Sequence, residues 1–315
     1  MKKAKILFYT ALGTAYLYVS TSLFLFHGPW PAVRSFVIDT LATTRHAYLL
    51  RPLSLYTLSE AEIKKHSVDW TKSTGVASTK PTRDFSSIED NSPPEIKTVQ
   101  YKTFKAQIVF ITDPKRVHVA ATKYIGVKGE TVEQLVKDSK AILGVNGGAF
   151  NDAGWRGTGG IPMGTTIVDG KYLAYSPTSP IVGITEYGQL VCGVYSKDQL
   201  MQLHVNNAVS FGPILVQNGV GVAPVDYSYQ PRVAIGQKAD GTMMLVVTSG
   251  REVLGPNDLG ATYKDIQNLM LENGAITAAN LDGGSSATLI YNGKLLNTPA
   301  DVLGERLVAT AFVVK

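Results

Sequence analysis

Residues 278–291 read AANLDGGSSATLIY, and the rest of the chain is organised around this stretch. Its first residues are small and apolar except for Asn280, which is typical of a strand packed on both faces. Asp282 follows on a turn in which Gly283 and Gly284 place no side chain beside the carboxylate. Residues 288–291 then resume an apolar strand. An unpaired charge between two buried strands costs folding free energy, so Asp282 is a candidate functional residue.

An Asp-Gly pair is also the usual sequence of a tight hairpin turn, which is the structural alternative for Asp282. The serines that follow, Ser285 and Ser286, often cap turns. Their hydroxyls can also face a ligand, and together with the paired glycines they favour a functional turn.

The surrounding sequence predicts an α+β domain. Capping boxes mark two helices, one at Thr131 with Gln134 and one at Thr262 with Asp265. The second helix, residues 262–273, ends at Gly274, which suits the left-handed position after a helix. We expect a large, strand-rich mixed sheet with a few flanking helices. The apolar runs that predict strands lie at residues 104–110, 117–121, 142–145, 161–167, 172–174, 181–184, 189–194, 232–236, 243–248 and 307–314.

The N-terminus has the composition of a membrane anchor. Lys2, Lys3 and Lys5 precede residues 6–26, which hold no charged side chain. As a helix these residues would span roughly 31 Å, about the thickness of the hydrocarbon core of a bilayer. We expect a single-pass signal anchor over residues 1–30, with a cytoplasmic N-terminus and an extracytoplasmic remainder. A cleaved signal peptide is the alternative, although Trp30-Pro31-Ala32 is a poor cleavage site.

Residues 31–95 are predicted as a juxtamembrane stalk and polar linker, and residues 96–315 as one globular domain. Residues 71–95 hold nine Ser or Thr and three Pro without periodicity, which is typical of a linker. Residues 1–105 hold 14 basic and 8 acidic side chains, and residues 106–315 hold 16 and 17. The excess positive charge therefore belongs to the anchor and stalk, where it suits anionic lipid or wall polymer. We expect no nucleic-acid partner, because the sequence contains no motif for one.

Other polar residues stand at the ends of predicted strands. Asn146 begins the turn Asn146-Gly147-Gly148, Arg232 precedes an apolar strand, and Arg251 follows one. Asn146 and Arg232 have structural alternatives, because Asn146 can satisfy a turn backbone and Arg232 can pair with a surface acid. Arg251 precedes Glu252, which is too close in sequence to pair well with it.

Several motifs occur together in a fixed order. They are NGGAF at residues 146–150, GP at 212–213 with NG at 218–219, PRVAIG at 231–236, GR at 250–251 and NLDGGSS at 280–286. This set resembles the phosphodiester glycosidase domain family, over about residues 100–315. The family includes the uncovering enzyme that removes N-acetylglucosamine from mannose 6-phosphate diesters, and bacterial surface proteins assigned to exopolysaccharide or cell-wall work. Ala149 replaces a usual aromatic and Ser285 a frequent third glycine, and both changes leave the polar residues in place.

The resemblance implies a hydrolase that cleaves a glycosyl-1-phosphodiester bond, of the N-acetylglucosamine-1-phosphate type, in a phosphodiester-linked glycan or wall polymer. Arginine matches phosphate oxygens bidentately, and a carboxylate stabilises positive charge that develops on the sugar. The predicted catalytic residues are therefore Asp282, Arg232, Asn146 and Arg251. The predicted substrate-binding residues are Gly147, Gly148, Asn280, Gly283, Gly284, Ser285 and Ser286.

A non-catalytic surface protein that binds wall polymer or modulates a wall enzyme is the alternative function. The sequence requires no cofactor, and none of its five histidines has metal-ligand spacing. Carboxylate and carbonyl oxygens also suit calcium, so a divalent cation at Asp282 stays open. The single cysteine, Cys192, is expected to be a small buried apolar residue.

Overall fold

This computed structural model describes residues 2–30, 34, 38, 59, 83–151, 158–226, 228–301 and 304–315. The chain forms two compact units, Met1–Val68 and Asp69–Lys315. Most of the predicted stalk and linker lies outside the described residues.

Helix α1 (Lys2–His27) covers the predicted anchor in the first unit. Within the described part of the chain, Lys3–His27 is the one helix that is long and apolar enough to cross a membrane. A signal sequence meets the same criteria of length and composition. The helix is therefore confirmed, and its role as an anchor stays a prediction.

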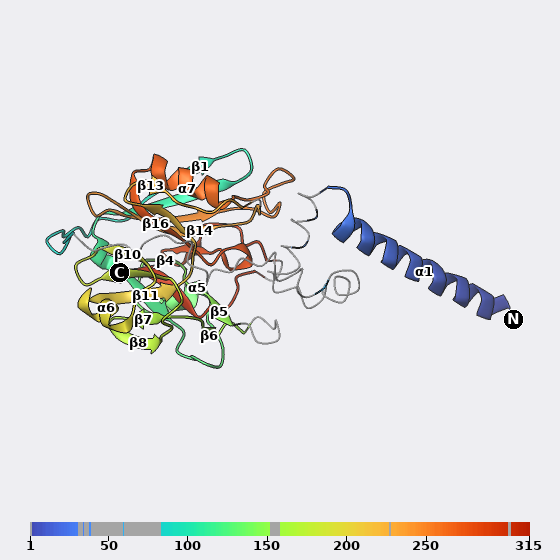
Figure 1. Cartoon of the computed structure of the whole chain (residues 1–315), viewed down its shortest axis with the longest axis horizontal. Helices are drawn as coiled ribbons and strands as arrows, with labels where there is room; N and C mark the ends of the chain where they lie inside the picture. Colours follow the sequence, from blue (N-terminus) through green and yellow to red (C-terminus); the bar gives the residue numbers. More distant parts are fainter. Residues whose placement is uncertain are drawn as a thin grey trace. The chain divides into compact units, whose positions relative to one another are not determined.

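The second unit is built from three principal sheets and one small hairpin (Figure 1). The seven-stranded sheet has the order β1 (Glu95–Gln100), β2 (Lys105–Ile111), β15 (Met243–Thr248), β14 (Val233–Lys238), β16 (Ala275–Leu281), β12 (Ile214–Gln217) and β13 (Val220–Gly221). The second sheet has the order β10 (Leu190–Gly193), β9 (Ile181–Thr185), β11 (Val205–Ser210), β7 (Thr166–Val168) and β8 (Lys171–Ala174). The third sheet has the order β18 (Lys294–Leu295), β17 (Leu289–Tyr291), β4 (Leu143–Asn146), β19 (Thr310–Val314) and β3 (Val117–Ala121), and β5 (Phe150–Asn151) pairs with β6 (Ile161–Pro162).

Every pairing between the described strands is antiparallel, so the prediction of one mixed sheet is wrong. The strand-rich α+β class agrees with the structure. Parallel neighbours need a crossover connection of about a dozen residues or more. The connections here are often too short for one, as between β14 and β15, where Gln237 already faces Met243 across a tight turn.

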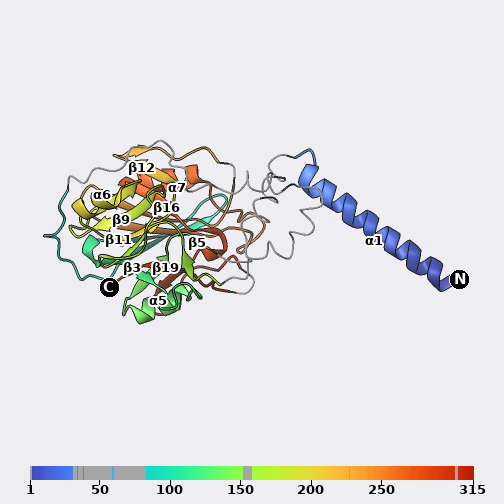
Figure 2. The ribbon, with the colours of Figure 1, turned by 60° about the horizontal axis from the view of Figure 1, so that its bottom comes forward.

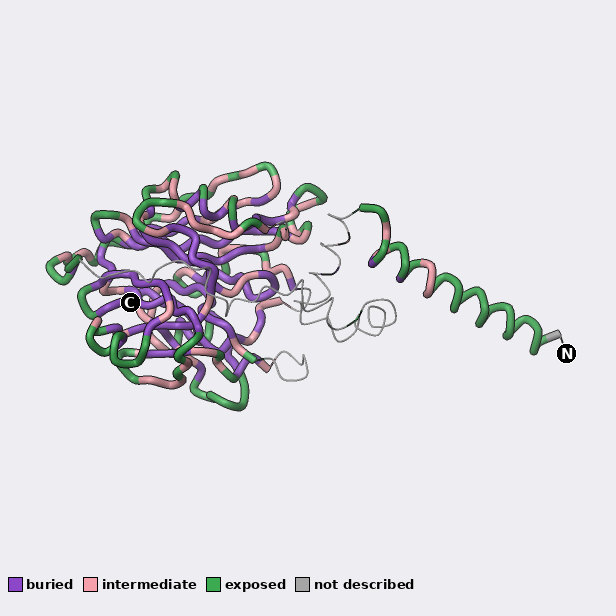
Figure 3. The backbone as a smooth tube through the Cα atoms, viewed as in Figure 1, coloured by how far each residue is buried: buried purple, intermediate pink, exposed green. Residues whose placement is uncertain are grey.

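The largest apolar cluster lies between the three sheets. Ile235 and Leu245 enter it from the seven-stranded sheet, Ile184 from the second sheet, and Val145 and Phe312 from the third. All five side chains are almost completely buried. Figure 3 shows the buried positions running along the strands and the exposed positions gathered at the connections. The three sheets therefore enclose one common core, which fixes their ends relative to one another.

The described helices of this unit are α5 (Val132–Asp138), α6 (Lys197–Gln202) and α7 (Tyr263–Glu272), with short 3₁₀ turns at Pro114–Arg116 and Gly284–Ser286. Helix α7 packs Ile266 and Leu269 against the face of the seven-stranded sheet that carries Ala234 and Val246. Helix α5 lies against β3 and β19 of the third sheet (Figure 2). The two predicted helices are thus confirmed as covers of outer sheet faces.

Helix α6 is absent from the sequence-based expectation. It begins with the same capping-box pattern as the other two, formed by Ser196 and Gln199. The signal was therefore present, but the helix that follows it has only six residues and no clear apolar stripe.

Residues 83–94 pack against the domain, ahead of the boundary predicted at residue 96. Phe85 is buried, and its amide donates to the carbonyl of Tyr187 at 2.9 Å. The Arg116 guanidinium donates to the carbonyls of Asp90 and Ser92. A lone aromatic in a polar run is a weak sequence signal, and only the packing shows that this part of the predicted linker belongs to the folded unit.

The antiparallel order gathers the predicted site residues at one end of the seven-stranded sheet. Strand β14 begins where β15 and β16 end, because Val233 pairs with both Val247 and Leu281. Arg232, at the start of β14, therefore lies near Asp282, which follows β16. The loop after β15 reaches the same edge.

Candidate active site

The backbone of Asp282 is held by the turn at the end of β4. The Asp282 amide donates to the Gly147 carbonyl at 3.1 Å, and the Asp282 carbonyl accepts a hydrogen bond from Nδ2 of Asn146. Oδ1 of Asn146 accepts from the Thr288 amide at 3.0 Å. One carboxamide therefore fixes the chain on both sides of the Asp282 turn and ties the third sheet to the seven-stranded sheet.

Asn146 was predicted to be catalytic. In the structure its carboxamide binds the backbone of Asp282 and Thr288. Its side chain is completely buried, and both of its polar atoms bind backbone groups. These contacts match the structural alternative that the sequence offered, in which the Asn146 side chain satisfies backbone groups of a turn. Asn146 lies in the site as a residue that positions Asp282.

Arg306 is a site residue that the sequence did not single out. Its Nη1 donates to Oγ of Ser285 at 3.2 Å and lies 3.4 Å from Oγ of Ser286. Its guanidinium stacks over the Phe150 ring, 4.9 Å from the centroid. Ser286 also hydrogen-bonds to the Asp282 carboxylate, so this serine lies between the anion and the cation. The sequence signal that could have identified Arg306 was its position directly before the last apolar run, residues 307–314.

Arg251 approaches Asp282 from the loop after β15. A Cβ atom at Gly284 would lie 2.9 Å from Nη2 of Arg251, so a side chain there would displace the end of the Arg251 side chain. The backbone of Gly284 also has a φ of +59°, which glycine adopts without strain. The second glycine of the Asp-Gly-Gly turn is therefore favoured by its backbone conformation, and it also leaves the end of Arg251 in place.

The guanidinium groups of Arg251, Arg306 and Arg232 lie close enough at the site to repel one another. Burial, with repulsion from Arg306 and Arg232, lowers the pKa of Arg251 to about 10, although Asp301 and Asp282 act in the opposite direction. Opposite charges favour ionisation of a group and like charges oppose it. An additional anion would relieve this repulsion, so the site is suited to a negatively charged ligand.

Burial raises the pKa of Asp282, and this cause outweighs the opposing effects of Arg306, Ser286, Arg251 and the Gly283 amide. The side chain is half-buried, so protein surrounds most of the carboxylate while part of the residue stays open to solvent. A carboxylate of this kind can act on a ligand and is not neutralised by one dedicated partner.

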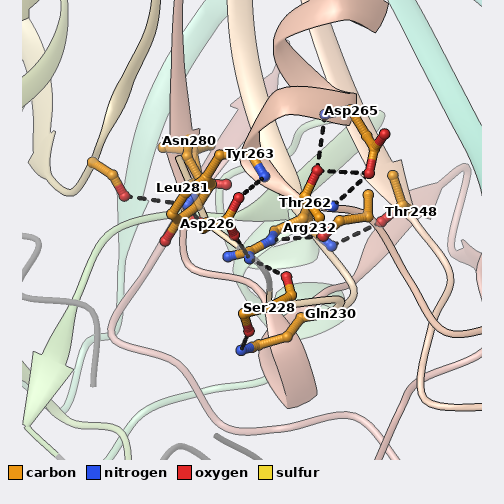
Figure 4. Close-up of polar contacts among 12 residues, drawn as sticks. Asp226, Ser228, Gln230, Arg232, Thr248, Thr262, Tyr263, Asp265, Asn280 and Leu281 are labelled. Atoms are coloured by element: carbon orange, nitrogen blue, oxygen red, sulfur yellow. Dashed lines mark hydrogen bonds and ion pairs between the residues drawn. The ribbon is translucent and has the colours of Figure 1, made fainter. Parts of the chain in front are cut away.

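Figure 4 shows Arg232 next to Asp226 and Ser228, near Thr262 and Tyr263 at the start of α7. Its Nη2 is 2.8 Å from Oδ2 of Asp226, and its Nε donates to the Ala261 carbonyl at 3.0 Å. The ring of Tyr263 lies 4.0 Å from the guanidinium carbon. This ion pair is the structural alternative expected for Arg232. The expected partner was a surface acid, but Asp226 and Arg232 are both largely buried. The catalytic role of Arg232 stays a prediction.

The glycine turns offer fewer free amides than the sequence suggested. A buried backbone amide must be paired, and these turns are tight enough to pair their own. The amide of Gly283 contributes to the environment of the Asp282 carboxylate. The other three amides donate within the chain, from Gly147 to the Thr310 carbonyl, from Gly148 to Oγ1 of Thr310, and from Gly284 to the Pro231 carbonyl. Substrate binding by these glycines stays a prediction, and it would have to use surfaces other than those three amides.

Asn280 is buried on β16, and its Nδ2 donates to the carbonyls of Gly212 and Leu281. Its Oδ1 has no hydrogen-bond partner among the described residues. Ser285 and Ser286 are also buried, where they hold Arg306. All three predicted residues therefore lie at the site, with most of their hydrogen bonds directed at the protein.

No group of three or more His, Cys, Asp or Glu in the described part of the chain could hold a metal ion. Whether a divalent cation binds beside Asp282 stays a prediction. The described geometry places the guanidinium groups of Arg251 and Arg306 near the Asp282 carboxylate, and a second acid, Asp301, also acts on Arg251.

Comparison with known proteins covers the part of the chain that carries the candidate site. The model of the phosphodiester glycosidase family matches residues 139–315, which include all the site residues named above. The SPbeta prophage-derived uncharacterized protein YomE of Bacillus subtilis (strain 168) is 28% identical over 233 residues, which are 69% of this chain and 35% of YomE. This chain thus spans about a third of the length of that relative.

Two solved structures share the fold. The catalytic domain of zebrafish N-acetylglucosamine-1-phosphodiester alpha-N-acetylglucosaminidase, auto-inhibited by its pro-peptide, has a TM-score of 0.62 and 22% identity, covering 76% of this chain and 88% of that one. A putative exported protein from Burkholderia pseudomallei K96243 has a TM-score of 0.52 and 18% identity, covering 67% of this chain and 74% of that one. The match to the family model over more than half of the sequence establishes that the chain belongs to the phosphodiester glycosidase family.

Proposed function

We propose that this protein is an extracytoplasmic hydrolase that cleaves glycosyl-1-phosphodiester bonds in a cell-wall or exopolysaccharide polymer. The family supports a glycosidase-type hydrolase. The observation that carries the proposal is the placement of the Asp282 carboxylate beside the guanidinium groups of Arg251 and Arg306. A bond of the N-acetylglucosamine-1-phosphate type presents the two partners that this arrangement suits, a phosphate anion and an anomeric carbon.

The two arginines bind the phosphate in this proposal. Arg251 and Arg306 present planar donor groups that match phosphate oxygens, and phosphate offsets the repulsion that they exert on each other. Ser285 and Ser286 accept hydrogen bonds from the guanidinium of Arg306 and so hold it in place. The leaving group is a stable phosphate monoester, so little proton donation is needed when the bond to the sugar breaks.

Asp282 acts at the sugar. The bond from the anomeric carbon to the phosphate oxygen breaks, and its electron pair stays on the phosphate. Water attacks that carbon, directly or after the Asp282 carboxylate has displaced the phosphate, and gives up a proton to a carboxylate or to solvent. The carboxylate stabilises the positive charge on the sugar, as nucleophile, as base for water or as electrostatic partner. Asn146 holds the backbone of Asp282 and leaves the carboxylate free for this work.

The substitution Asp282→Asn keeps the shape of the side chain and removes its charge. We expect turnover of an N-acetylglucosamine p-nitrophenyl phosphodiester to fall about 100-fold or more. The melting temperature should stay the same or rise slightly at neutral pH, because burial already disfavours the charged form. Steady-state kinetics and thermal unfolding measure the two effects.

Asp198→Asn is the matched control, since Asp198 is an exposed acid at the start of α6. It should leave turnover unchanged. If Asp282→Asn unfolds while its folded fraction keeps full specific activity, Asp282 is only a structural turn residue. If the wild type fails to hydrolyse such diesters with and without calcium, the binding protein becomes the better function.

The pH dependence should follow the raised pKa of Asp282. The ratio kcat/KM should fall as the pH is lowered through this value, because the charged carboxylate is the active form. For stability the sign is opposite. The folded protein binds the proton more tightly than the unfolded chain, so Asp282 favours folding below its unfolded pKa and loses this contribution as the pH rises through the folded value.

Arg306→Gln removes a positive charge that lowers the pKa of Asp282, so the acid limb of the pH–rate profile should move to higher pH. An acid limb that lies at the ordinary aspartate value and does not respond to Arg306→Gln would assign the titration to another group.

Hydrolysis in oxygen-18 water identifies the bond that breaks. Attack at the anomeric carbon places the label in the released sugar, and mass spectrometry of both products detects it. Label in the phosphate would mean attack at phosphorus, and the role proposed for Asp282 would have to be withdrawn.

The location is proposed from α1 and the basic residues before it. The full-length protein should fractionate with membranes, and protease added outside the cell should release the domain by cutting within residues 71–82. Immunoblotting of membrane and supernatant fractions measures this. A mature protein in the culture medium that begins near residue 33 would instead identify a cleaved signal peptide.

A further inference from the structure

The loop that carries Arg251 has a backbone that most residues avoid. Arg251 has a φ of +59° and Glu252 a φ of +61°, so two successive non-glycine residues are left-handed. Such conformations persist when the surrounding structure holds them in place, and they concentrate at functional sites. The contacts that hold this pair therefore decide where the Arg251 guanidinium lies.

The principal contact is the carboxylate of Asp258, which is buried at the base of the loop. One oxygen accepts a hydrogen bond from Oγ of Ser249, and the other accepts from the amide of Leu254 at 3.1 Å. Ser249 directly follows β15 and pairs with Lys105 of β2, since the Ser249 amide donates to the Lys105 carbonyl at 2.9 Å. Asp258 thus connects the tip of the loop to the edge of the sheet.

Backbone hydrogen bonds close the loop around the same point. The Arg251 amide donates to the Leu259 carbonyl at 3.3 Å, and the Glu252 amide donates to the Asp258 carbonyl at 2.6 Å. Behind Arg251, a Cβ atom at Gly250 would lie 2.7 Å from Cα of Gly260. The base of the loop is therefore packed backbone against backbone. Asp258 restrains the part of the loop near Leu254.

The hydrolysis proposed above does not use Asp258. Its carboxylate makes its contacts inside the loop, and a buried charge is retained only where hydrogen bonds compensate for its lost hydration. We propose that Asp258, acting through Ser249 and the loop backbone, is a positioning residue that holds Arg251 against the Asp282 turn. This inference rests on the proposed function, because it assigns Asp258 to the phosphate-binding half of that site.

A double-mutant cycle in the full-length protein tests the inference. Arg251→Ala and Asp258→Ala should each lower kcat/KM by about 10- to 100-fold, because a misplaced binding group costs that much. The double variant should be no worse than Arg251→Ala, since residues that act through one another are not additive. Ser249→Ala is the milder second variant, for use if Asp258→Ala does not fold, and it should show the same coupling.

The cycle is repeated on the binding of inorganic phosphate, measured by calorimetry, because this readout needs no turnover. Asp258→Ala should weaken phosphate binding and raise KM. A purely structural role would lower the folded fraction, and hence kcat, while KM and the phosphate affinity of the folded molecules stayed unchanged. That result would overturn the inference.

Asp240→Ala is the matched control. Asp240 accepts from the Thr242 amide at 3.0 Å in the turn between β14 and β15, at the other end of the same strands. Its effect should be small and additive with Arg251→Ala. If the wild type is active and the effects of Asp258→Ala and Arg251→Ala are additive, the positioning role is overturned and the proposed hydrolase activity stands. A wild type that neither hydrolyses the diester nor binds phosphate would overturn the hydrolase and, with it, the positioning role.

Discussion

The side-chain amide of Asn146 is the contact on which the site depends. It accepts from the backbone of Thr288 and donates to the backbone of Asp282, so one neutral group fixes the turn between β16 and β17 from both sides. The strand that carries Asn146 belongs to the third sheet, while β16 belongs to the seven-stranded sheet. Because both sheets border one apolar core, the position of the Asp282 carboxylate is set by the packing of the whole domain. The anchoring groups are neutral dipoles, which leave the charge of the carboxylate available.

The three arginines near this turn are not equivalent. Arg232 is paired with Asp226 and braces the start of α7, so its charge is largely compensated inside the protein. Arg251 and Arg306 repel each other, and that repulsion contributes to the lowered pKa of Arg251. A site that keeps like charges together stores free energy, and an anionic ligand can release it. This repulsion is the physical reason for our proposal that the site takes a phosphodiester and not a neutral glycan.

Much of the local structure could be read from residue patterns. The capping boxes at Thr131 and Thr262 mark helices that the structure contains, since the hydroxyl and amide contacts involved are local. Strand β11 and helix α6 were not predicted, because Asn206 and Asn207 interrupt the apolar pattern of β11 and α6 has only six residues. The sheet type was predicted wrongly, since strand direction depends on which strands pair, and periodicity carries no information on pairing.

The sequence by itself determined the apolar N-terminal helix, the strand-rich domain, and the glycine turn that presents Asp282 after a buried strand. These features follow from local periodicity, capping and turn chemistry, which act over a few neighbouring residues. Only the tertiary structure decided which polar groups reach the carboxylate. In the folded chain Asn146 binds the backbone of Asp282, and Arg232 pairs with Asp226. Arg306, which is 20 residues further along the chain, binds Ser286. The physical reason is that a buried polar group takes whichever partner the packed strands bring within hydrogen-bond distance, and that partner is distant in sequence.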